Sequence, residues 1–201
     1  MEFDIKQIII IIMSAAFVNN YVLRQFLGVC PFLGVSKDIK SSVGMGFSVT
    51  FVMIMASAVT WPIQRYLLDP SGLEFMQTVV FILIIATLVQ LVEITLKKFA
   101  PPIHASLGIF LPLIVTNCAV LGLTISNINN EYSFIMAIAA ALGAGLGFLL
   151  AMLLFTGIRQ ELANANPPDS FKGMPITLIS AAILSIAFFA FEGVIENIFG
   201  K

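Results

Sequence analysis

Two cysteines, Cys30 and Cys118, are the residues of this chain best suited to redox or metal chemistry. Each opens the same short motif, C-x-x-L-G-x-[ST]: residues 30–36 read Cys-Pro-Phe-Leu-Gly-Val-Ser, and residues 118–124 read Cys-Ala-Val-Leu-Gly-Leu-Thr. If the fold brings the two thiols together, they can form a disulfide or hold half of a metal site. An iron–sulfur cluster takes four thiolates, so a second chain with the same arrangement would have to supply the other two. A cluster held in this way inside a membrane would carry one electron at a time between the two faces.

Two other interpretations stay open. A cysteine in a membrane helix is usually a small apolar packing residue, which would make the chain a purely structural membrane subunit. An internal repeat, taken alone, equally favours a secondary transporter. The cysteine pair separates these hypotheses, because only the electron carrier requires both thiols.

The elements that must position the thiols are those of an all-α integral membrane protein. Of the 201 residues, 59% are hydrophobic and 10% are charged, whereas soluble domains carry roughly 25% charged residues. A helix that spans the bilayer needs about 20 apolar residues. Six runs of this kind predict six transmembrane helices, at about residues 5–24, 43–66, 75–97, 103–126, 132–157 and 174–197. The net charge of −1 offers no basic surface to nucleic acid.

A second short match indicates that the chain contains an internal repeat. Gly44-Met-Gly46-Phe47 follows the first cysteine motif, and Gly145-Leu-Gly147-Phe148 follows the second in the same order. Each half holds three predicted helices, an odd number, so the second half must enter the membrane from the opposite side. We therefore expect one transmembrane domain over residues 1–201, built as two inverted three-helix repeats of about 1–100 and 101–201.

The first and fourth helices are expected to be broken. The interrupting residues are Gly28, Pro31 and Gly34 in the first helix and Gly108, Pro112 and Gly122 in the fourth. Proline removes a helical hydrogen bond, so the freed backbone groups need other partners within the protein. In inverted-repeat proteins the functional site lies near the midplane at such interruptions. By contrast, we expect Gly44, Gly46, Gly143, Gly145 and Gly147 to let helices approach closely.

The distribution of basic residues predicts the orientation of the chain. One side of the predicted bundle carries three basic residues, Lys6, Arg65 and Lys201. The other side carries six, Lys37, Lys40, Lys97, Lys98, Arg159 and Lys172. The positive-inside rule therefore places both termini outside and the three more basic loops in the cytoplasm.

A few polar residues lie close to the cysteines or within the apolar runs. Asn19, Asn20 and Asn117 are candidates to hydrogen-bond unwound backbone near the thiols, or else to make ordinary contacts between helices. Arg24 can anchor a helix end, or its positive charge can favour the reduced state of a nearby cluster. Glu93 is a candidate cation ligand on an ion path, the alternative being an ion pair with Lys97 at the helix end.

The two cysteine segments resemble the RnfA/NqrE family of membrane subunits. The resemblance is carried by Val18-Asn19-Asn20 with residues 26–37, by residues 107–114 with 116–122, by Gln90-x-x-Glu93 and by Gly157-Ile158-Arg159-Gln160-Glu161. It runs over nearly the whole chain, and the cysteine segments are closer to the Rnf branch of the family.

The resemblance implies a membrane electron-transfer subunit of an ion-translocating ferredoxin:NAD oxidoreductase in the bacterial or archaeal cytoplasmic membrane. It implies that Cys30 and Cys118 hold half of an intramembrane [2Fe-2S] cluster, shared with a homologous RnfE-like subunit of opposite orientation. FMN and NAD are then expected only on other subunits of the complex, and the transported ion is Na⁺ or H⁺. The chain agrees in having no dinucleotide-binding fingerprint, so we expect no complete active site on it alone.

Overall fold

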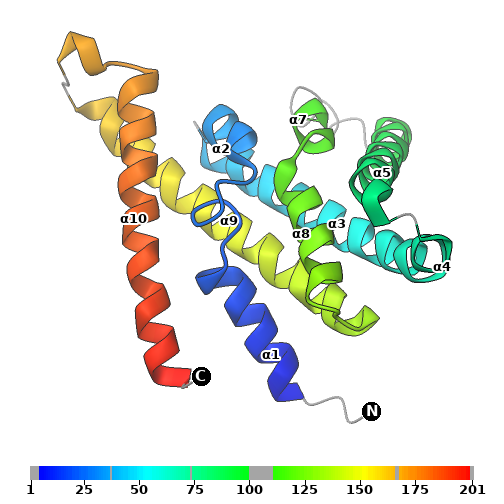
Figure 1. The fold of residues 1–201 in the computed structure, drawn as a ribbon. Helices are drawn as coiled ribbons and strands as arrows, with labels where there is room; N and C mark the ends of the chain where they lie inside the picture. Colours follow the sequence, from blue (N-terminus) through cyan, green and yellow to red (C-terminus); the bar gives the residue numbers. More distant parts are fainter. Residues whose placement is uncertain (1–4, 37, 73, 100–110, 166–167, 200–201) are drawn as a thin grey trace.

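The computed structural model describes residues 5–36, 38–72, 74–99, 111–165 and 168–199, and every regular element among them is a helix. The elements in chain order are α1 (Ile5–Met13), the π-helix η1 (Ser14–Val18), α2 (Val29–Val35), α3 (Ile39–Ile63), the π-helix η2 (Gln64–Leu68), α4 (Asp69–Ser71), the 3₁₀-helix η3 (Glu74–Met76), α5 (Gln77–Phe99), α7 (Leu111–Val115), α8 (Cys118–Asn129), α9 (Phe134–Asn164), the 3₁₀-helix η4 (Asp169–Phe171) and α10 (Met174–Phe199). Figure 1 shows their arrangement.

Several of these helices are long and apolar enough to cross a bilayer. Within the described residues, three helical stretches meet both criteria: Ile39–Leu68, Gln77–Ile94 and Phe134–Asn164. Shorter apolar helices cover Lys6–Val18, Leu113–Asn129 and Met174–Ala190. Large apolar side chains point outward, as Phe47, Leu83 and Ile186 do with exposed fractions of 64%, 65% and 71%. An apolar surface of this kind suits lipid rather than water, so the predicted all-α membrane class is confirmed at this level.

The prediction of a first helix over residues 5–24 is wrong for residues 19–24. The helix ends at Val18, and residues 19–28 form a turn before α2 begins. The reason is local, because the Asn20 side chain accepts hydrogen bonds from the amides of Val22 and Leu23 and so competes with the helical pattern.

The predicted fourth helix, residues 103–126, is also interrupted. Its described part consists of α7 and α8, separated by Thr116 and Asn117.

In the first segment, Pro31 does not cause the break: it is the third residue of α2, inside the first turn, where proline is tolerated. Gly108, another of the predicted interrupting residues, lies outside the described residues.

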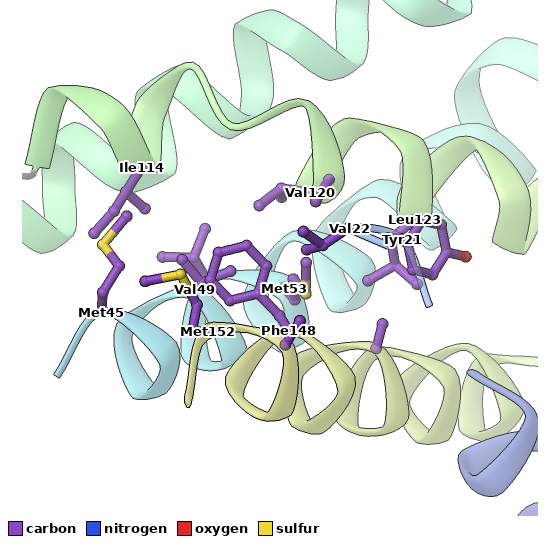
Figure 2. Close-up of a cluster of buried hydrophobic side chains, with 14 of the residues drawn as sticks. Tyr21, Val22, Met45, Val49, Met53, Ile114, Val120, Leu123, Phe148 and Met152 are labelled. Atoms are coloured by element: carbon purple, nitrogen blue, oxygen red, sulfur yellow. The ribbon is translucent and has the colours of Figure 1, made fainter. Parts of the chain in front are cut away.

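The core is built on the contact between α3 and α9, which lie side by side (Figure 1). Glycines of the predicted repeats lie at this contact: a methyl group added at Gly145 would be 2.5 Å from Thr50 Cγ2, and one added at Gly46 would meet Leu149. The expectation of close approach is thus confirmed for these two glycines, whereas a methyl at Gly44 would meet nothing within 4 Å. Ser42 and Thr156 hydrogen-bond across the same contact at 2.7 Å. Figure 2 shows the buried side chains that α8 and the 19–28 turn add to this core.

The π-helix η1 approaches α9 closely at Gly147. A methyl group there would lie 2.7 Å from Ala16 O and 3.0 Å from Ala16 Cα, both backbone atoms that cannot move aside easily. We therefore expect Gly147→Ala to destabilise the protein by about 1–3 kcal/mol, the usual cost of overpacking. The measurement is the midpoint of thermal inactivation in detergent.

Gly157→Ala is the matched control, because Gly157 lies on the same helix and an added methyl would meet nothing within 4 Å. That variant is expected to keep the wild-type midpoint or to raise it slightly, since alanine favours helix. Equal midpoints for the two variants would contradict the close approach of η1 to α9.

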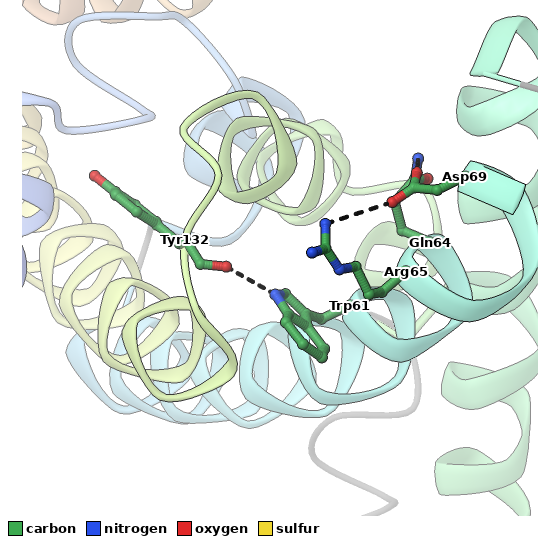
Figure 3. A network of polar contacts seen from close by, with 5 residues as sticks. All are labelled: Trp61, Gln64, Arg65, Asp69 and Tyr132. Atoms are coloured by element: carbon green, nitrogen blue, oxygen red, sulfur yellow. Dashed lines mark hydrogen bonds and ion pairs between the residues drawn. The ribbon is translucent and has the colours of Figure 1, made fainter. Parts of the chain in front are cut away.

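A small polar network fixes the end of α3 (Figure 3). Trp61 Nε1 donates to the backbone oxygen of Tyr132 at 2.8 Å, and the Trp61 ring packs edge-on against Phe134 at 5.6 Å. Arg65 lies 4.0 Å from Asp69 in an exposed pair one turn apart. The network ties α3 to the turn between α8 and α9, far along the chain from it.

The described chain begins and ends at the same end of the molecule. In Figure 1, the start of α1 and the end of α10 lie at the bottom, and the end of α9 and the start of α10 lie toward the top. This arrangement agrees with termini on one side of a membrane, while the side that they face remains a prediction.

Candidate functional site

Cys30 is the second residue of α2, immediately after the 19–28 turn, and its side chain is exposed. The turn contains two residues in the left-handed region, Phe26 at φ 55° and Gly28 at φ 78°. Gly28 is the residue before the helix, so its conformation sets the direction in which α2, and with it Cys30, leaves the turn.

Cys118 occupies a corresponding place in the second half. It is the first residue of α8 and is also exposed. Asn117 caps this helix, since its Oδ1 accepts a hydrogen bond from the amide of Ala119 at 3.0 Å. Each cysteine therefore begins a helix that follows an interruption.

The two interruptions touch each other at their capping residues. A methyl group on Gly28 would lie 2.9 Å from Asn117 Oδ1 and 3.1 Å from both Ala119 Cβ and Phe148 Cε2. The residue before α2 therefore contacts the start of α8, although 88 positions separate Cys30 from Cys118. Backbone can approach this closely only where there is no side chain, which explains why a glycine is needed at position 28.

Gly28→Ala is expected to damage this contact. Alanine is strained at φ 78°, and its methyl would clash with Asn117. We therefore expect the free energy of unfolding to fall by roughly 1–3 kcal/mol. Because Gly28 and Asn117 directly precede the helices that carry the two cysteines, a metal bound by those cysteines should be lost before the protein unfolds. The measurements are iron content after mild chelation and the thermal midpoint.

Gly72→Ala is the matched control for Gly28→Ala. Gly72 also has a positive φ, 63°, but a methyl there would meet nothing within 4 Å. An iron loss of the same size in both variants would mean that the contact with Asn117 has no role.

The asparagines and the arginine proposed from the sequence all lie in or beside the breaks. Asn20 is buried at 1% exposure, and its Nδ2 donates to the backbone oxygens of Ala16 at 3.2 Å and Gly147 at 2.8 Å. Its Oδ1 accepts from the amides in the following turn, at 3.0 and 3.2 Å. Asn19 accepts from the Arg24 guanidinium, which places that positive charge beside the turn. The structure thus gathers Asn19, Asn20 and Arg24 on the Cys30 side, and Asn117 on the Cys118 side.

A polar cavity lies next to the first break. Its volume is about 350 Å³, and it opens between η1, the end of α8 and the start of α9. Most of its lining side chains carry neutral polar groups: Ser14, Asn19, Tyr21, Gln25, Ser126, Asn130 and Tyr132. A polar cavity of this size in a membrane protein can hold water.

Glu93 is the residue that the sequence proposed for an ion path. It is partly exposed on α5, which packs against α3, α7 and α8. In Figure 1, α5 lies on the far side of α8 from α2. Glu93 is not among the residues that line the polar cavity.

The structure adds contacts that the sequence did not single out. Ser185 on α10 donates from Oγ to the backbone oxygen of Leu23, which ties α10 to the 19–28 turn. Arg159 reaches from α9 to the end of α2, and Phe32 of α2 stacks on Phe155 of α9. The sequence placed Arg159 among the basic loop residues and in the segment 157–161 that carries the resemblance, but it gave no sign of a contact with α2, because no local pattern joins positions so far apart.

The donor set at this site is two thiols. Among the described residues, no group of three or more cysteine, histidine, aspartate or glutamate side chains is placed to hold a metal ion. An iron–sulfur cluster would therefore fit here only as half of a site, with two further thiolates from another chain. The exposure of both cysteines agrees with that arrangement, since each side chain can be reached from outside the chain.

Comparison with known proteins gives a consistent result. Residues 8–195 match the family described as Rnf-Nqr subunit, membrane protein. The chain is 54% identical to the A subunit of the Na(+)-translocating ferredoxin:NAD(+) oxidoreductase complex of Acetobacterium woodii, over 92% of this chain and 97% of the relative. It is 50% identical to the A subunit of the ion-translocating oxidoreductase complex of Syntrophotalea carbinolica, over 96% and 100%. Its identity to the protein of the same description from Proteus mirabilis is 46%, over 94% and 97%.

Proposed function

The chain belongs to the Rnf-Nqr family of membrane subunits, and from this premise we propose that it is a subunit of an ion-translocating oxidoreductase complex of the Rnf type. In that complex it conducts electrons through the membrane, and it holds no complete active site of its own. The observation that carries this proposal is the contact of Gly28 with Asn117, which sets two exposed thiols at the starts of neighbouring helices.

Cys30 and Cys118 are proposed to hold half of a [2Fe-2S] cluster. The remaining two thiolates come from a homologous RnfE-like subunit, which packs against the exposed face of α2 and α8. A [2Fe-2S] cluster accepts and donates one electron at a time. FMN and NAD belong to other subunits, where soluble domains can bind them.

The residues around the thiols favour negative charge at this point. The first turn of a helix presents backbone amides without intrahelical acceptors, and their partial positive charge attracts thiolates. Two such turns meet here, and the Arg24 guanidinium lies beside the turn that leads to Cys30.

We further propose six membrane spans arranged as two inverted repeats, in the cytoplasmic membrane, with both termini outside. The support for this count is three long apolar helices and three shorter ones in the described chain. The broken segments around Asn19–Gly28 and Thr116–Asn117 complete the first and fourth spans. The more basic loops, with Lys40, Lys98, Arg159 and Lys172, then face the cytoplasm.

The ion moved by the complex is Na⁺ or H⁺. The relative from Acetobacterium woodii is described as Na(+)-translocating, and at 54% identity this favours Na⁺ for the present chain. Glu93 stays a candidate on the ion path, on the α5 side of the molecule. The polar cavity beside Asn19 is a second candidate, because neutral oxygen atoms and water suit a hydrated cation.

The test is iron and acid-labile sulfide analysis of the purified complex, combined with low-temperature EPR, before and after replacement of the two thiols. We expect one EPR signal to depend on this chain. If iron content and spectrum do not change, the cysteines only pack and the chain is structural. Uptake of a solute by a complex that lacks both thiols would instead favour the secondary transporter.

A further inference from the structure

The short helix that carries Cys30 is held along one stripe of α9. Phe148 lies against Gly28, Phe155 stacks on Phe32 with ring centres 4.2 Å apart and planes 18° apart, and Arg159 reaches the last turn of α2. Positions 148, 155 and 159 are seven and four residues apart, so they share one face of the helix. Thus α9 supports the beginning, the middle and the end of α2.

Arg159 makes the polar contact at the end of α2. Its Nη1 donates to the backbone oxygen of Leu33 at 2.7 Å and to Ser36 Oγ at 2.8 Å. Leu33 is one turn beyond Cys30, and Ser36 is the buried residue that ends the helix. A cation that binds the last carbonyl groups of a helix satisfies acceptors that have no intrahelical donor, and it complements the helix dipole.

A helix of this length cannot hold its own orientation. α2 has only seven residues, and isolated helices shorter than about 12 residues are marginal even with good helix formers. Its direction therefore depends on tertiary contacts. Of the contacts along the stripe, the one from Arg159 is directional, because hydrogen-bond geometry fixes both acceptors relative to α9.

We propose that Arg159 is a positioning residue for Cys30: by fixing the end of α2 on α9, it sets where the thiol at the other end of that helix lies. This inference rests on the proposed function only in the statement that Cys30 binds a cluster. The positioning of α2 itself can be tested whether or not iron is present.

The test variant is Arg159→Met, which keeps much of the side-chain length but removes the charge and the donors. In the purified complex, amide hydrogen exchange in residues 29–35 is expected to become about tenfold faster, because loss of a charge-assisted hydrogen bond favours local opening. Exchange in residues 118–129 of the same sample is the internal reference and should not change. The EPR spectrum of the reduced complex should shift or broaden, because one thiolate is no longer held in a fixed place.

Two further variants keep the proposal falsifiable if Arg159→Met assembles poorly. Arg159→Lys retains the charge and can reach one acceptor, so its exchange rate and spectrum should lie between those of wild type and Arg159→Met. Ser36→Ala removes one acceptor and leaves the bond to Leu33, so its effect should be smaller. Arg65→Met is the matched control, because Arg65 is an exposed arginine whose partner Asp69 is on the neighbouring turn.

The outcomes separate this proposal from the proposed function. Wild-type exchange in residues 29–35 of Arg159→Met, or an equal change in Arg65→Met, would overturn the role of Arg159. Faster exchange with an unchanged EPR spectrum would also overturn it, because α2 would be held without positioning a cluster ligand. A wild-type complex with no iron at this chain would refute the cluster alone, and exchange would still decide whether Arg159 holds α2.

Discussion

Replacing Cys30 or Cys118 with serine is expected to remove the intramembrane iron signal and to stop electron transfer through the complex. Both side chains are exposed and serine is nearly isosteric, so the substitution should leave the helices intact. A serine hydroxyl is a poor substitute for a thiolate at iron. The fall in electron transfer should exceed the ~10–100-fold that loss of an outer-shell partner costs at a metal site. The measurements are iron and sulfide per complex, the EPR spectrum and the rate of ferredoxin-dependent NAD reduction.

The single variants should resemble each other, because each would leave the proposed cluster with three of its four thiolates. Thermal stability and subunit content should match those of the wild type, which separates loss of the ligand from loss of the fold. Arg65→Gln, an exposed change in η2, is the control for nonspecific effects of substitution and purification and should keep full activity. Electron transfer that persists in the double variant would rule out the cysteines as electron carriers.

Asn20→Ala is expected to produce the largest loss of stability. Asn20 is buried, and its amide joins the end of η1, the turn that follows and the backbone of α9 at Gly147. Alanine would leave the amides of Val22 and Leu23 and the oxygen of Gly147 without these partners. At about 1–3 kcal/mol for each buried group left unpaired, a total of about 3 kcal/mol or more is expected. The measurement is the midpoint of thermal inactivation, together with the amount of chain in the membrane.

Asn130→Ala is the matched control for this loss. Asn130 also donates from its side chain, to Ser126 O at 2.9 Å and Ser126 Oγ at 3.1 Å, but it is exposed. Its removal should change stability by no more than about 0.5 kcal/mol, as usual for surface positions. If Asn20→Ala reduced stability as little as Asn130→Ala, other contacts would have to stabilise the turn before Cys30.

The apolar runs of the sequence predicted most of the helices well. The second, third, fifth and sixth runs correspond to α3, α5, α9 and α10, because long apolar stretches have few alternatives to a helix in lipid. The sequence also identified Gly46, Gly143, Gly145 and Gly147 as places of close approach, since a small residue in such a helix leaves room for a neighbour.

The shape of the breaks could not be read from composition. Hydropathy continues through Tyr21, Val22 and Leu23, so it gives no sign that Asn20 turns the chain there. The contact of Gly28 with Asn117 and the bonds from Arg159 to α2 join residues that are remote in sequence. Such contacts depend on the packing of α9 against α2 and α8, which a local pattern does not contain.

The contact between α3 and α9 also determines when this protein can complete its fold during synthesis. Ser42 and Thr156, which bond across that contact, are separated by 114 residues. At ribosomal speeds of about 5–20 residues per second, α3 waits on the order of ten seconds before its partner leaves the ribosome. During that interval its small-residue face has no native neighbour in the chain. Until then lipid or another protein covers that face, and a fragment that ends after α5 should be degraded rather than accumulate.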